Sequence, residues 1–234
     1  MSLLQVRDLN AGYGRVQILW GVSLAVEQRQ IVALVGANGA GKTTLLRAIS
    51  GMIPSRSGSI TFQGHETRGA SIERIVDLGV AHVPEGRRLF TGLTVRENLL
   101  VGGWRRRTTD LSRVLELFPL LGGRLNQVAS TLSGGEQQMC AIARGLMGRP
   151  DLLMIDELSL GLAPNTVDQI VERLPDIAAS GTAILLVEQD IDTALTVSEQ
   201  AYVLETGRIT ISGRSANLLE DPAIQEAYLG LTPD

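Results

Sequence analysis

The sequence predicts an α/β fold with a mainly parallel sheet. Short buried apolar segments at 30–35, 80–83, 151–156 and 183–187 are separated by stretches with helical or turn character. With 234 residues, 44% of them hydrophobic and 20% charged, the chain can bury a real core, as one large domain or two small ones. A glycine-rich segment joins the first of these buried strands to the following helix, and the rest of the chain can be placed around it.

This glycine-rich segment matches the phosphate-loop pattern G-x-x-x-x-G-K-[ST] without a mismatch. Its residues are Gly36, Ala37, Asn38, Gly39, Ala40, Gly41, Lys42 and Thr43, followed by Thr44. Glycines let successive backbone N–H groups point at phosphate oxygens, and the helix start adds a positive end. Lys42 can reach the β- and γ-phosphates, and the Thr43 hydroxyl can bind Mg²⁺. The alternative is a glycine-rich turn before an ordinary helix, and the strand–loop–helix context favours the phosphate loop.

Composition excludes several classes of protein. The net charge of −4 argues against a general nucleic-acid binder. No apolar run reaches the length of a membrane span, and no signal peptide is recognised at the N-terminus. The single cysteine, Cys140, cannot form an internal disulfide, which favours a reducing cytosol. The basic run 105–107 is interpreted as a solvated helix end or loop, with a phosphate or lipid-headgroup contact as the minor alternative.

The N-terminal part is predicted to form strands at 3–9 and 18–26, with a turn at 10–14 between them. A helix begins at about Thr43, a loop covers 54–58, and a strand covers 59–62. A short helix over 71–77 leads to the buried strand 80–83. Tyr13 lies in the predicted turn, where its ring could stack on adenine or be an ordinary exposed tyrosine.

The middle of the chain changes to helical character. Thr94 with Glu97 forms a capping box before a helix through about Leu100, and a second helical pattern covers 111–118. Another S-x-x-E start at Ser133 leads into a helix that ends near Met147. Residues from about 87 to about 146 are therefore predicted to be a mostly helical insert between strands of the sheet.

The C-terminal part returns to alternating strands and helices. The segment 164–179 is predicted as helix, which Pro175 kinks or splits, and a short helix ends at about Val197. Segments 201–204 and 208–212 flank Thr206-Gly207 and predict a hairpin. A closing helix is predicted over 222–229.

Two acids follow the buried strand at 151–156. Asp156, at the strand end, can hold Mg²⁺ through water opposite the phosphate-loop threonine. Glu157 is then placed to polarise an attacking water as general base. An apolar run that ends in two acids is common by itself, but after a phosphate loop in the same chain it indicates a nucleoside triphosphatase.

The run Leu132-Ser133-Gly134-Gly135-Glu136-Gln137-Gln138 resembles the signature of ATP-binding-cassette (ABC) ATPases. As a capped, glycine-rich helix start it is a natural anion site. The resemblance covers essentially the whole chain. It implies the ABC ATPase fold, a P-loop NTPase with a RecA-like core, an N-terminal antiparallel β subdomain and an α-helical subdomain. We expect residues 1–84 and 147–234 to form the core with its β subdomain, and 85–146 the helical subdomain.

The resemblance also implies roles for individual positions. The residues Ser133, Gly134, Gly135 and Glu136 would bind the γ-phosphate that the phosphate loop of a second subunit holds, so that two cassettes close over two ATP molecules. Tyr13 matches the adenine-stacking aromatic. Glu85 falls where a glutamine usually links the Mg²⁺ site to the helical insert, so it is a candidate nucleotide and metal contact. Gln189 falls at the switch histidine that contacts the γ-phosphate.

Some positions depart from the family pattern. Gln189 cannot carry positive charge, Leu158 replaces a proline after Glu157, and Ala163 replaces an aspartate of the dimer-interface loop. None of these removes Lys42, Asp156 or Glu157, so we expect hydrolysis, at a slow rate that a partner accelerates.

Within the family, four runs look like the shorter ATPase subunit of branched-chain amino-acid importers. They are residues 83–90, 133–139, 159–164 and 186–189. This resemblance implies ATP and Mg²⁺ as ligands, and as partners a second ATPase subunit, identical or different, and two membrane permeases. A solute-binding protein would act indirectly, and the subunit would lie in the cytoplasm on the inner face of the cell membrane. The alternatives are the matching subunit of a urea or short-chain amide importer, and a soluble ABC-type ATP switch.

Overall fold

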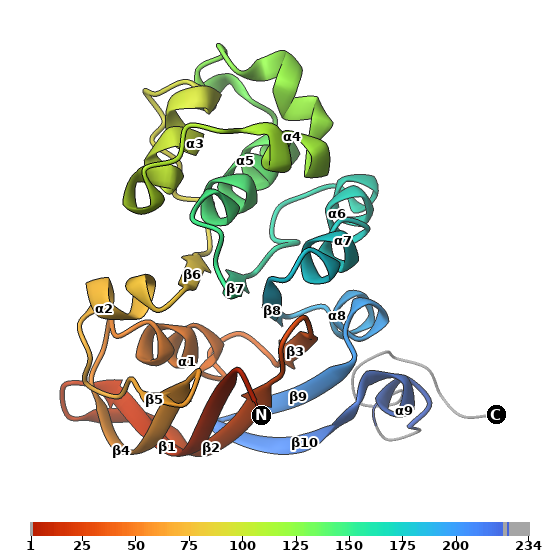
Figure 1. Ribbon diagram of the computed structural model, residues 1–234. Helices are drawn as coiled ribbons and strands as arrows, with labels where there is room; N and C mark the ends of the chain where they lie inside the picture. Colours follow the sequence, from red (N-terminus) through yellow and green to blue (C-terminus); the bar gives the residue numbers. More distant parts are fainter. Residues whose placement is uncertain (1, 222–223, 225–234) are drawn as a thin grey trace.

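Two sheets organise the protein, whose computed structural model describes residues 2–221 and residue 224 (Figure 1). Neighbouring strands of the larger sheet are, in order, β10 (Arg208–Arg214), β9 (Gln200–Glu205), β3 (Ile31–Val35), β8 (Ala183–Glu188), β7 (Leu152–Asp156) and β6 (Val80–Val83). All neighbours pair in parallel except β10, which forms the predicted hairpin with β9. This arrangement confirms the α/β prediction and brings the carboxyl ends of β3, β7 and β8 to one edge.

The smaller sheet is antiparallel and lies at the N-terminal end of the chain. Its strand order is β2 (Val16–Val26), β1 (Leu4–Tyr13), β4 (Ser55–Phe62) and β5 (His65–Glu66). Two sequence predictions here were wrong. Residues 10–13 of the predicted turn belong to β1, and residues 55–58 of the predicted loop belong to β4, because β1 and β4 pair across both segments with register shifts.

Helix α1 (Lys42–Ile49) packs between the two sheets. Its buried Leu45, Leu46 and Ile49 belong to one core with apolar side chains from both sheets. Burial of this apolar stripe on two sides stabilises a helix of only eight residues, which would not be stable alone. The start of α1, which carries the phosphate loop, is thereby held rigidly at the edge of the larger sheet.

The segment between β6 and β7 is helical, as predicted. Its helices are, in order, α3 (Val95–Gly103), η1 (Trp104–Arg106), α4 (Ser112–Leu117), η2 (Pro119–Arg124), η3 (Ala129–Thr131) and α5 (Gly134–Met147). A further short helix, α2 (Ile72–Asp77), lies before β6. Figure 1 shows α3, α4 and α5 grouped beyond one end of β6 and β7. The predicted capping boxes of α3 and α5 are both present.

The last helices cover the remaining surface of the larger sheet. As predicted, the helix is split near Pro175: α6 (Pro164–Val171) ends first, and Pro175 lies in the first turn of α7 (Leu174–Ala179). Both helices pack with α5 and β8 in a second core. Helix α8 (Ile191–Val197) and the unpredicted α9 (Ser215–Leu219) pack on β3 and β9. The helix predicted over 222–229 lies outside the described residues, apart from Ile224.

Candidate functional site

The phosphate loop connects the buried strand β3 to α1. Gly39 and Gly41 have φ angles of 82° and 112°, where side chains are strained. Gly36 needs its missing side chain for a different reason, because a Cβ there would lie 2.3 Å from the carbonyl oxygen of Leu204. Gly41 caps α1, and no side-chain capping hydrogen bond is present at this helix start. The loop presents the backbone of a helix N-terminus, which suits an anion.

Lys42 lies at the centre of the site and is only 4% exposed. Its ammonium donates to the carbonyl oxygens of Gly36 at 2.7 Å and Ala37 at 3.3 Å. It also forms an ion pair with Glu157, with 3.0 Å between Nζ and Oε1. All three ammonium protons therefore have an acceptor, so a phosphate must exchange with one of these acceptors to contact Lys42.

Asp156, at the end of β7, is buried, and neither carboxylate oxygen has a hydrogen-bond partner among the described residues. Burial raises the pKa of Asp156 to about 6, with smaller contributions from the Glu157 and Glu85 charges, while Thr43 and Lys42 act in the opposite direction. A buried, unpartnered carboxylate beside a threonine hydroxyl fits a hard cation such as Mg²⁺. The described residues contain no cluster of three or more His, Cys, Asp or Glu that could hold a metal by itself, so phosphate or water would supply further ligands.

A cavity of about 500 Å³ adjoins the phosphate loop. Its lining comes from the loop, from the turns after β6 and β7 and from β2: Ile18, Ala37, Asn38, Gly39, Gly41, Lys42, Thr43, Thr44, Glu85, Glu157 and Leu160. Most predicted phosphate-loop residues thus meet Glu85 and Glu157 at one cavity. Gln189 lines an adjoining cavity with Glu157 and Ser159.

Glu157 occupies a strained turn that neighbouring groups hold in place. Its φ of 52° lies in the left-handed region, and its N–H donates to the Val187 carbonyl at 2.9 Å. Two residues later, Ser159 donates to the buried Glu188 carboxylate from its N–H at 2.9 Å and from its hydroxyl at 2.8 Å. Burial raises the pKa of Glu188, and the Ser159 hydrogen bonds oppose that rise. The carboxylate at the end of β8 therefore fixes the turn that carries Glu157.

Sequence reasoning assigned no role to Glu188 or Ser159. Glu188 directly precedes Gln189 and follows a buried strand, as Asp156 does, and that position at the sheet edge was the available signal. The partnership itself joins residues 29 positions apart.

The signature segment forms the start of α5 and does not line the phosphate-loop cavity. Ser133 accepts from the Glu136 N–H, and Glu136 accepts from the Ser133 N–H at 2.7 Å. A Cβ on Gly135 would lie 2.1 Å from Thr166 Cγ2 of α6, so packing requires this glycine. No residue from 133 to 136 is among the described residues that line the cavity. A contact of this segment with nucleotide on a second molecule stays a prediction.

Tyr13 lies at the end of β1 with 40% of its surface exposed. Its hydroxyl accepts from the Arg47 guanidinium at 3.0 Å. Tyr13 does not line the phosphate-loop cavity described above. Its ring is accessible for stacking, and its role as an adenine contact stays a prediction.

Comparisons with known proteins agree with this geometry. Residues 19–159 match the family described as ABC transporter. The chain is 46% identical to the high-affinity branched-chain amino acid transport ATP-binding protein BraG of Pseudomonas aeruginosa, over 97% of this chain and 100% of the relative. It is 30% identical to BraF of the same organism, which has the same description, over 97% of this chain and 98% of the relative.

Among solved structures, the fold is similar to the ADP conformation of MJ1267, an ATP-binding cassette of an ABC transporter. The TM-score is 0.86 and the identity 26%, over 99% of this chain and 100% of that chain. The protein binds nucleotide and is an ATP hydrolase of transport systems. The chain belongs to the ABC transporter family of ATP-binding proteins.

Proposed function

We propose that this protein is the ATP-hydrolysing subunit of an importer for branched-chain amino acids. The observation that carries the proposal is the 46% identity to BraG over 97% of this chain and 100% of the relative, against 30% to BraF. The gap between these values favours a BraG-type role, and BraF supports a second, related cassette as partner. We further propose that residues 85–146 act as a helical unit and residues 1–84 and 147–234 as an α/β core with its β subdomain, a division that the helices between β6 and β7 support.

The catalytic proposal assigns one task to each group at the cavity. The phosphate-loop N–H groups and Lys42 bind the β- and γ-phosphates, and Thr43 and Asp156 would hold Mg²⁺. The bound cation would supply charge that stabilises the transferring phosphoryl group. Glu157 acts as general base toward water once phosphate replaces it as the partner of Lys42. Gln189 and the Glu85 turn contact the nucleotide site from its edge.

The partners in this proposal are a second cassette, identical or different, and two membrane permeases. The helix start at Ser133 would contact nucleotide held by the second cassette. Within the described residues, no helix combines the length and apolar character required to cross a bilayer. From the similarity to BraG and BraF, we propose that this subunit works on the inner face of the membrane through permeases, with a solute-binding protein upstream.

The test is purification of the protein with its associated subunits from its own cells in mild detergent, followed by reconstitution into vesicles. We expect leucine, in the presence of the solute-binding protein, to increase ATP hydrolysis and to accumulate inside. Stimulation by urea or acetamide instead would overturn the amino-acid assignment but keep the importer. Recovery with soluble partners alone would contradict the importer itself.

A further inference from the structure

We propose that the basic corner of the helical unit binds the phosphate headgroups of anionic phospholipids. We define this corner as Trp104, Arg105, Arg106, Arg107, Thr108, Thr109 and Arg149. It takes no part in the nucleotide site. The inference goes beyond the proposed function, because lipid binding does not depend on which solute the transporter moves.

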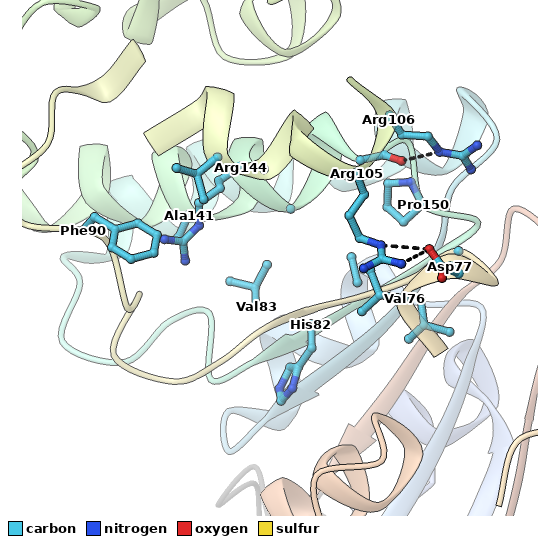
Figure 2. Close-up of a pocket in the computed structure, with 17 residues that line it drawn as sticks. Val76, Asp77, His82, Val83, Phe90, Arg105, Arg106, Ala141, Arg144 and Pro150 are labelled. Carbon is cyan, nitrogen blue, oxygen red and sulfur yellow. Dashed lines mark hydrogen bonds and ion pairs between the residues drawn. The ribbon is translucent and has the colours of Figure 1, made fainter. Parts of the chain in front are cut away.

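Two chain segments meet at this corner. Arg106, Arg107, Thr108, Thr109, Asp110 and Arg149 line one hollow of about 630 Å³. The first five follow α3, and Arg149 follows α5. Arg106 Nε donates to the Gly148 carbonyl at 3.2 Å and so joins the two segments. Figure 2 shows this bond and shows that Arg105 points the other way, toward Asp77. Three arginines and two threonines, together with Asp110, therefore line one open space.

The charge at this hollow is only partly compensated. Arg105 forms an ion pair with Asp77. Asp110 accepts hydrogen bonds from the Ser112 hydroxyl and N–H. These bonds are the main cause of its lowered pKa, and the Arg149 charge contributes less. No ion pair among the described residues involves Arg106, Arg107 or Arg149. The hollow is therefore positive on a chain whose net charge is −4, and guanidinium groups match phosphate oxygens in geometry and charge.

The exposed Trp104 side chain favours a membrane surface over a free phosphate compound as the ligand of this corner. Its side chain is 81% exposed, the highest value among the exposed large hydrophobic residues of the described chain. It lines a second hollow with Arg105, Arg107, Thr108 and Thr109. A tryptophan beside arginines is the arrangement that favours the boundary between lipid headgroups and acyl chains. A small aliphatic phosphate such as glycerol phosphate would have no apolar group to bury against this indole.

The experiment measures binding of the purified protein to vesicles of equal parts phosphatidylglycerol and phosphatidylcholine, by flotation at low salt. Pure phosphatidylcholine vesicles provide the neutral comparison. The double variant Arg107→Gln/Arg149→Gln removes two charges from the corner. The control Arg68→Gln/Arg96→Gln removes two exposed arginine charges elsewhere. Because the sequence has two tryptophans, Trp20→Phe leaves Trp104 as the fluorescent reporter.

We expect binding to the anionic vesicles only, weakened about 30-fold in the corner variant and much less in the control. In the Trp20→Phe protein, the fluorescence should shift to the blue on binding. Equal affinity of the corner variant and its control would overturn the proposal. Full displacement from vesicles by millimolar glycerol phosphate, with no fluorescence shift, would assign a free phosphate compound instead. ATP hydrolysis measured without vesicles reports whether each variant is folded. The rate of the corner variant should equal that of the Arg68→Gln/Arg96→Gln control.

Discussion

The protein contains two glycine-rich helix starts, and they are satisfied in opposite ways. At α1, Gly41 caps the helix without a side chain, and a buried lysine lies beside it. At α5, Ser133 and Glu136 form a capping box, and Arg124 forms an ion pair with Glu136 at 3.1 Å. The first start keeps backbone donors available for a ligand, whereas the second already satisfies its own.

The glycines at the two starts also have different causes. Gly39 and Gly41 of the phosphate loop are needed for their positive φ angles. Gly135 is needed because Thr166 packs against it, whereas a Cβ on Gly134 would lie 3.2 Å from the end of the Arg87 side chain. The difference suggests that α1 can bind phosphate within a single subunit. The α5 start already satisfies its own donors, and its contact with nucleotide on another molecule stays a prediction.

The largest expected effect tests the α1 site through Glu157→Gln. The amide oxygen can still accept from Lys42, so the fold should persist, but the group cannot take a proton from water. We expect hydrolysis to fall by at least about 100-fold while ATP binding is retained. Steady-state ATPase and nucleotide binding measure the two quantities. The exposed Glu172→Gln is the matched control, and a variant rate equal to that control would remove Glu157 as base.

The next largest effect is expected at the same α1 site, because Glu188 positions the turn that carries Glu157. In Glu188→Gln, one carboxylate oxygen that accepts from Ser159 becomes an NH₂ donor. We expect kcat to fall about tenfold with little change in KM for ATP, since a shift of Glu157 affects chemistry more than binding. Ser159→Ala should act in the same direction, and the double variant should be no worse than the stronger single one. Additive losses would mean that the two residues act separately.

The nucleotide side of this site was the easiest part to predict. Its phosphate-loop residues are contiguous from Gly36 to Thr44, so their arrangement depends on local chain conformation and not on which distant segments pair. Asp156 and Glu157 could be added because buried parallel strands end at a common edge. The bond between Ser159 and Glu188 could not be predicted, because it depends on which strands are neighbours and on the turn at Glu157.

The antiparallel sheet shows the opposite case. Asn10 and Gly58 have the composition of turns, yet both lie within paired strands. The Asn10 amide bonds the Ser57 hydroxyl across the sheet at 2.9 Å, and Gly58 takes a φ of 89° at an irregularity in the pairing. Local turn propensity was overruled by pairing with a distant segment, which no window of sequence contains.

A smaller effect is expected at the α5 start, where Ser133→Ala removes the cap. Thr94→Ala removes an equivalent cap from α3, whose capping box is built in the same way, and is the matched control. Each variant should lose about 1 kcal/mol of unfolding free energy. Only Ser133→Ala should also lower ATP hydrolysis in the assembled dimer. If both variants hydrolyse ATP equally well, the α5 start is a structural cap alone.

The smallest effect concerns the other end of α1, where the charge of Arg47 acts on His82 of β6. Both His82 ring nitrogens are buried without a hydrogen-bond partner among the described residues. Burial lowers the pKa of His82 to about 4 from 6.5, and the Arg47 charge adds to this. The unfolded chain therefore binds a proton more readily, so this group costs stability as the pH falls from 6.5 through 4.

His82→Leu removes both the unpaired nitrogens and the titration, and we expect it to add about 1 kcal/mol to the free energy of unfolding at pH 7. Urea unfolding at pH 7.5 and pH 5 checks this, because the advantage of the variant should grow at pH 5. An advantage that stays constant with pH would mean that His82 is accessible to protons in the folded state.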